Sequence, residues 1–130
     1  MLDTSAVLAF FFDEPGADTV EQALPGAAIS VVNLGELFGV VRRSGVEASP
    51  REVEGHLASA GVSVVSPTSA TARLAADYVA TPTPRGAASI SLADGFCLAH
   101  AAEAGVPVLT ADRAWAETPF EHPVDIQLVR

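Results

Sequence analysis

The sequence contains no lysine, a single cysteine and no apolar run long enough to cross a membrane. One cysteine, Cys97, excludes an internal disulfide and a zinc site built from several cysteines. The apolar runs fall short of the roughly eighteen residues that a membrane span needs, and no basic segment precedes an apolar core at the start. We therefore expect a cytoplasmic protein with no signal peptide and no membrane association.

Positive charge is also scarce. Sixteen acidic residues face seven arginines, for a formal net charge of −9. Proteins that bind nucleic acid usually carry a basic surface, so this balance counts against such a function unless a few arginines or a basic partner supply the contacts. Because guanidinium groups bind phosphate through paired hydrogen bonds, Arg42, Arg43 and Arg113 are the candidates for substrate binding.

The order of the expected elements predicts the fold class. We expect strands at 2–3, 28–31, 62–65, 106–109 and 124–129, and helices at 5–12, 17–24, 32–44, 50–60, 69–79, 92–104 and 114–117. This alternation predicts a single α/β domain over residues 1–130, a three-layer α/β/α sandwich with a mainly parallel central sheet. The first strand is only about 7 Å long. Two interpretations stay open: a natural start further upstream, or a trimmed centre of the sheet.

Four acids stand in otherwise apolar stretches: Asp3 in MLDTSA, Glu36 in VVNLGEL, Asp94 in SLADGF and Asp112 in VLTADRAW. A carboxylate in such surroundings needs a stabilising partner. Two of the acids follow strands and two lie on helices, so we expect all four at the carboxyl edge of the sheet. Their mutual repulsion there would be about 4 kcal/mol per pair at contact distance. A divalent metal with oxygen ligands is the best candidate to offset it.

Each acid also has an ordinary structural explanation. Asp3 could cap the helix that follows it, but the next two residues, Thr4 and Ser5, could do this instead and leave Asp3 free. Glu36 alone would be a solvated helical residue, and Asp94 lies in a first turn, where negative charge favours the helix. The joint pattern of the four, rather than any one of them, indicates a site.

The segments MLDTSAVLAFF, VVNLGEL and SLADGFCLAHAAEAGVPVLTADRAW together resemble the PIN domain, and more narrowly the VapC-type toxin ribonucleases of bacterial toxin–antitoxin pairs. The resemblance covers nearly the whole chain, and its last segment is the most specific. It implies Mg²⁺ or Mn²⁺, endonucleolytic cleavage of RNA, a homodimer and a complex with a small VapB-type antitoxin. The residues that it assigns are an acidic quartet, Asp3, Glu36, Asp94 and Asp112, and two hydroxyl supports, Ser5 and Thr110.

The expected chemistry is hydrolysis of a phosphodiester by water. We expect Asp3 and Asp94 to bind a metal directly, because Mg²⁺ keeps several waters and takes few carboxylates. Whether Glu36 and Asp112 bind a second metal, act through water or orient the nucleophile stays open. Asn33 lies one helical turn before Glu36 and is a third supporting residue. With water as the nucleophile and the 3′-oxygen as the leaving group, we expect a 3′-hydroxyl and a 5′-phosphate at the cut.

Other functions remain as alternatives. The main one is a PIN-like binding module with negligible activity that acts through complex formation. A haloacid-dehalogenase-type phosphatase needs a second aspartate where Ser5 stands, and a response-regulator receiver needs a lysine that the chain lacks. Trp115, close to Asp112, fits either a packing residue or a platform for a stacked base.

Overall fold

The computed structural model describes all residues, 1–130. Its helices are α1 (Thr4–Phe11), α2 (Ala17–Ala23), α3 (Val31–Arg43), α4 (Pro50–Ser59), α5 (Ser69–Ala80), α6 (Leu92–Ala104) and α7 (Arg113–Glu117). Its strands are β1 (Ala28–Ser30), β2 (Ser63–Val65), β3 (Val108–Thr110) and β4 (Ile126–Leu128). No helix is both long and apolar enough to cross a membrane.

A single residue near the start of the chain, Leu2, joins the two halves of the sheet. β1 pairs with β2 and β3 with β4, in both cases parallel. Leu2 forms parallel bridges to Ile29 on one side and to Leu109 on the other. The order is therefore β2–β1–Leu2–β3–β4, and the chain moves outward in one direction before it crosses to the other. Ligands of open parallel sheets bind beyond the carboxyl ends of the strands at such a reversal.

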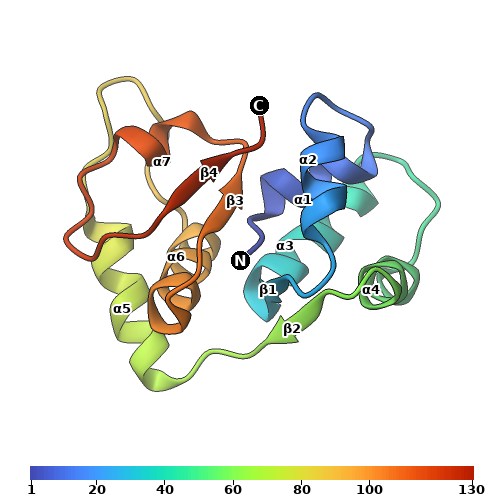
Figure 1. The fold of residues 1–130 in the computed structure, drawn as a ribbon, viewed down its shortest axis with the longest axis horizontal. Helices are drawn as coiled ribbons and strands as arrows, with labels where there is room; N and C mark the ends of the chain where they lie inside the picture. Colours follow the sequence, from blue (N-terminus) through green and yellow to red (C-terminus); the bar gives the residue numbers. More distant parts are fainter.

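The two faces of the sheet carry separate hydrophobic cores. α1, α2, α3 and α4 cover one face, and α5, α6 and α7 cover the other (Figure 1). Neighbouring strand residues alternate between these cores: Leu2 and Leu109 belong to the first, Met1 and Val108 to the second. This alternation is the two-residue period of a strand that is buried on both faces. The three-layer α/β/α sandwich expected from the sequence is thereby confirmed.

Most expected elements are present with ends shifted by one or two residues. The main differences concern the last two strands, β3 and β4. Val106 was expected to begin a strand, but its N–H donates to the carbonyl of Ala101, 3.1 Å away, and so closes α6. Gly105, at φ +64°, makes this helix end possible, and the strand begins two residues later. The last strand, expected at 124–129, is limited to the part that pairs with β3.

Helices α5 and α6 pack unusually close to each other. A Cβ atom added to Gly95 would lie 2.8 Å from the carbonyl oxygen of Ala75 and 2.8 Å from Cγ2 of Val79. Any larger residue at this position must push the helices apart. The glycine stands directly after Asp94, so this contact sets the position of that acid relative to the sheet.

Candidate active site

All four acids singled out in the sequence line one pocket of about 210 Å³. Its lining residues are Asp3, Thr4, Ser5, Leu8, Glu36, Val40, Asp94, Asp112 and Trp115. They come from α1 and α3 in one helical layer and from α6 and α7 in the other. The pocket therefore lies between the two layers, at the carboxyl edge of the sheet.

Asp3 is the buried centre of the pocket, with 3% of its surface exposed. Its Oδ2 accepts hydrogen bonds from the hydroxyls of Ser5 and of Thr110, the latter at 2.9 Å. The backbone N–H of Asp3 donates to the carbonyl of Leu109 at 3.0 Å, which ties the residue to β3. The two hydroxyl residues expected to support the site thus both hold Asp3.

Asp3 also caps α1, so of the two possibilities that the sequence left open, capping by Asp3 and not by Thr4 or Ser5 is the one observed. Its side chain accepts from the backbone N–H of Ser5 at 3.3 Å, and its own backbone is extended. Thr4 and Ser5 cannot serve as caps because their side chains are engaged with Glu36 and with Asp3. The Asp3 carboxylate therefore both caps α1 and lines the pocket. The same oxygen, Oδ2, accepts the capping hydrogen bond and the hydrogen bonds from the Ser5 and Thr110 hydroxyls.

Glu36 is oriented by Thr4, a residue that the sequence analysis did not assign to the site. The Thr4 hydroxyl donates to Oε2 of Glu36, and Nδ2 of Asn33 donates to Oγ1 of Thr4 at 3.2 Å. Asn33, expected as a supporting residue on the same helix face as Glu36, therefore contacts Glu36 only through Thr4. The only sequence signal for Thr4 is its position directly after Asp3.

The other two acids are held by backbone groups at helix starts. Oδ2 of Asp94 accepts the N–H of Ser91 at 2.7 Å within a reciprocal capping box at the start of α6. Oδ1 of Asp112 accepts the N–H of Ala114 at 2.9 Å, which makes Asp112 the cap of α7. Helix starts stabilise negative charge, so three of the four acids sit where a carboxylate is locally favourable.

One oxygen of each carboxylate is fixed, and the other makes no hydrogen bond within the chain. The bonded oxygens are Oδ2 of Asp3, Oε2 of Glu36, Oδ2 of Asp94 and Oδ1 of Asp112. No arginine or histidine lines the pocket to neutralise them. Four oriented oxygen ligands without an internal cation fit a hard divalent metal.

The four acids do not, however, form a closed cage. No three of the side chains lie close enough together to hold one ion directly. This suits Mg²⁺ better than Ca²⁺, since Mg²⁺ binds through one or two carboxylates and keeps several of its waters.

Burial and neighbouring negative charges raise the pKa values of Asp3 and Asp94. The pKa of Asp3 is raised to about 6, mainly by burial and also by the Asp94 charge, against the opposing hydrogen bonds from Ser5 and Thr110. The pKa of Asp94 is also raised, first by burial and then by the charges of Glu36 and Asp112. A protein in which neighbouring carboxylates raise each other's pKa stores free energy that a bound cation releases.

None of the three arginines expected to bind substrate lines the pocket. Arg42, Arg43 and Arg113 are all exposed. A Cβ atom on Gly39 would lie 3.3 Å from Nη1 of Arg43, so this guanidinium folds back along α3 by one turn. Arg43 follows Glu36 by seven residues, about two helical turns, and therefore shares its face, whereas Arg42 lies about 120° away from that face around the helix.

Comparison with known proteins agrees with this geometry. The family model of the PIN domain matches residues 1–121. The chain belongs to the PIN domain family. Among solved structures, this PIN domain is similar to a chain described as a toxin–antitoxin complex from Klebsiella pneumoniae, with a TM-score of 0.70. That match is 16% identical in sequence and covers 99% of this chain and 96% of the other, and it shows a shared fold. None of the curated proteins matches the chain.

Domains of the PIN family are generally nucleases, and family membership supports the same coarse description for this chain. The nuclease class agrees with a pocket of carboxylates at the end of a parallel sheet. It also agrees with the sequence resemblance, which rested on segments that now line the pocket.

Proposed function

We propose that this protein is a Mg²⁺- or Mn²⁺-dependent endoribonuclease, the VapC-type toxin of a toxin–antitoxin pair. The observation that carries the proposal is the set of four carboxylates around one pocket, each with one oxygen held and one unengaged, and with no cation of the chain among them. Such a pocket has little structural value by itself, because its acids repel one another.

Each residue has a distinct part in the proposed reaction. Asp3 and Asp94 would hold the metal, which when bound lowers the pKa of a coordinated water and neutralises phosphate oxygens. Ser5 and Thr110 keep the Asp3 carboxylate in one orientation, and Thr4 does the same for Glu36. Glu36, which is exposed, can accept a proton from the attacking water at its unengaged oxygen.

The proposal includes two protein partners. A VapB-type antitoxin would cover the pocket, and the apolar surface beside it supports this: Leu8 and Val40 line the pocket, and Phe12 of the nearby aromatic run is 37% exposed. A second copy of the chain is proposed at the α5–α6 side, where Leu92 is 63% and Val79 38% exposed. A basic antitoxin would also compensate the net charge of −9.

An RNA cleavage assay tests the proposed activity. The purified protein should cleave single-stranded RNA with Mg²⁺ or Mn²⁺ and should be inactive with excess EDTA. The products should carry 3′-hydroxyl and 5′-phosphate ends, which selective ligation before sequencing detects. Cleavage that survives EDTA would contradict the metal mechanism. Absence of cleavage with either metal, together with tight antitoxin binding, would instead favour the binding-module alternative.

The arginines of α3 provide a matched pair of variants. Arg43→Ala should weaken RNA binding several-fold and lower the slope of log affinity against log salt by about 0.7, the value for one phosphate contact on a single strand. Arg42→Ala removes the same charge from the next residue, on a different face, and should leave the slope nearly unchanged. Equal effects of both variants would mean that the arginines act only through the general charge of the protein.

A further inference from the structure

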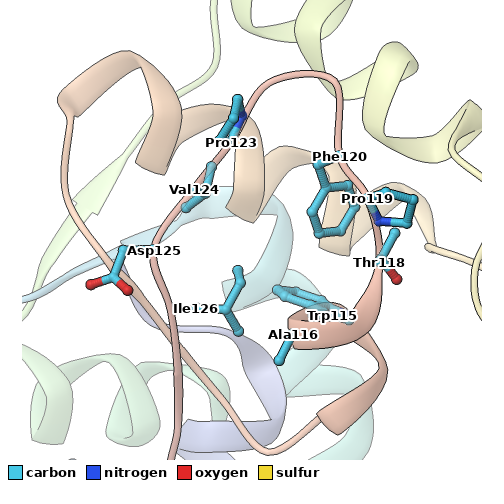
Figure 2. Close-up of a pocket in the computed structure, with 9 residues that line it drawn as sticks. All are labelled: Trp115, Ala116, Thr118, Pro119, Phe120, Pro123, Val124, Asp125 and Ile126. Atoms are coloured by element: carbon cyan, nitrogen blue, oxygen red, sulfur yellow. The ribbon is translucent and has the colours of Figure 1, made fainter.

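A second cavity, of about 340 Å³, lies beside the acidic pocket (Figure 2). It is formed by α7, the loop after it and the start of β4. Its lining residues are Trp115, Ala116, Thr118, Pro119, Phe120, Pro123, Val124, Asp125 and Ile126. Ligand pockets range from about 300 to 1,000 Å³, so this volume suits a small planar group better than a large cofactor.

One residue, Trp115, lines both this cavity and the acidic pocket. Its side chain is 2% exposed and packs in the core formed with α5 and α6. The two cavities thus share one lining residue, which lies on the helix that Asp112 caps. A flexible ligand chain that has a charged group bound at the carboxylates can therefore place its next group in the second cavity.

The cavity wall opposite β4 is aromatic, and its ring is held in place by neighbouring contacts. The ring of Phe120 meets the ring of Tyr78 edge-on, with centroids 5.3 Å apart and planes at 74°. The Tyr78 hydroxyl in turn donates to the carbonyl of His122 at 2.8 Å, which anchors the loop to α5. A ring that is already held in place loses little entropy when a ligand stacks on it.

The remaining wall offers hydrogen-bonding groups without a facing charge. Val124, which lines the cavity, uses neither its backbone N–H nor its carbonyl in a hydrogen bond within the chain, so this residue has one donor and one acceptor without a partner. The Asp125 carboxylate points away from the centre of the cavity in Figure 2, and it accepts a hydrogen bond from Nε2 of Gln127 at 3.0 Å. An anionic ligand in this cavity therefore does not face the Asp125 carboxylate.

We propose that this cavity binds a nucleobase of the RNA strand, next to the phosphate held at the carboxylates; this rests on the proposed nuclease function and adds a determinant of where it cuts. Single-stranded RNA is recognised mainly by stacking of splayed bases on aromatic side chains and by hydrogen bonds to their edges. Phe120, which is half-buried, provides the aromatic surface for stacking, Trp115 forms part of the wall shared with the acidic pocket, and the Val124 backbone can bind a base edge.

Because Trp115 is the only tryptophan of the chain, its fluorescence reports on the cavity directly. The wild-type protein with Mg²⁺ is titrated with the four nucleoside 5′-monophosphates and with ribose 5-phosphate. At least one nucleotide should quench the emission in a saturable way, and ribose 5-phosphate should not. Ala116→Phe places a ring in the cavity, and Phe120→Ala removes the stacking wall. Each variant should weaken the binding of that nucleotide about tenfold or more.

Glu117→Phe is the matched control, since it adds the same ring to an exposed neighbour that does not line the cavity. It should leave the titration unchanged, and circular dichroism checks that every variant is folded. Equal quenching by ribose 5-phosphate, or nucleotide quenching that Ala116→Phe and Phe120→Ala leave unchanged, would overturn the proposal, because the ligand would then lie only at the carboxylates.

Sequencing of cleavage ends from a random RNA pool separates this proposal from the nuclease function. Wild-type protein should show a base preference at one position beside the cut, and Ala116→Phe should relax it while cleavage continues. An unchanged preference in the variant overturns the base site and leaves the nuclease intact. If the wild type does not cleave, the proposed function fails, and the nucleotide titration still decides what the cavity binds.

Discussion

Asp94→Asn should lower RNA cleavage by a factor of at least about 100 while the fold is retained. The amide preserves the size of the side chain and can still accept the N–H of Ser91 through its oxygen. It removes the negative charge that a hard cation requires from a ligand. Cleavage rates at saturating Mg²⁺ and Mn²⁺, together with thermal unfolding, measure the two effects separately.

Asp18→Asn is a close control for this variant. Asp18 is likewise an acid in a first helical turn, that of α2, but it is exposed and outside the pocket. Both substitutions lose an interaction with a helix start of about 0.3–1 kcal/mol, and only Asp94→Asn also relieves repulsion in the pocket. Full activity of Asp94→Asn, or equal loss in Asp18→Asn, would remove Asp94 from the catalytic residues.

The metal-free protein should lose stability as the pH rises from about 4 to above 6. The folded-state pKa of Asp3 is about 6, against 3.8 for an unperturbed aspartate, because the residue is buried. The folded state therefore binds more protons than the unfolded state in this interval, and the free energy of unfolding falls with pH. The difference of 2.2 pKa units corresponds to about 3 kcal/mol, fully lost above pH 6.

Denaturant unfolding at pH 4.5 and pH 7.5 in EDTA measures this effect. Asp3→Asn should flatten the dependence, since the amide does not titrate and can still cap α1. Mg²⁺ or Mn²⁺ should stabilise the wild type at pH 7.5 and have little effect on the variant. A wild-type stability that is the same at both pH values would show that Asp3 is not the buried carboxylate described above.

The arrangement of the fold could be read from the sequence because its signals are local. Strands buried on both faces appear as short apolar runs, and helix starts are marked by Ser49, Thr68 and Ser91, all of which cap their helices. The acids were recognised for a related reason: a carboxylate at a strand end or in an apolar stretch is locally unexpected. Their presence in one pocket followed from the rule that parallel strands end at one edge.

The supports of these acids depended on contacts between segments that are distant in the chain. Thr4 reaches Glu36 across 32 positions, and Thr110 reaches Asp3 across 107. Neither separation leaves a periodic signal, since only the packing of α1 against α3 and of Leu2 against β3 brings the partners together. The same holds for Asp3 itself, whose double role as cap and buried carboxylate depends on its neighbours' hydroxyls being engaged elsewhere.

Only the tertiary structure distinguished among residues that look alike in the sequence. Arg42 and Arg43 are adjacent and identical residues in the sequence, and the structure shows that the Arg43 side chain folds back along α3 to the position where Gly39 has no side chain. For Trp115 the sequence favoured packing over base stacking, and the structure makes it a core residue that also lines two cavities. The sequence by itself determined the elements and the acids, because these depend on local pattern. Side-chain direction and shared walls depend on three-dimensional packing, which local pattern does not encode.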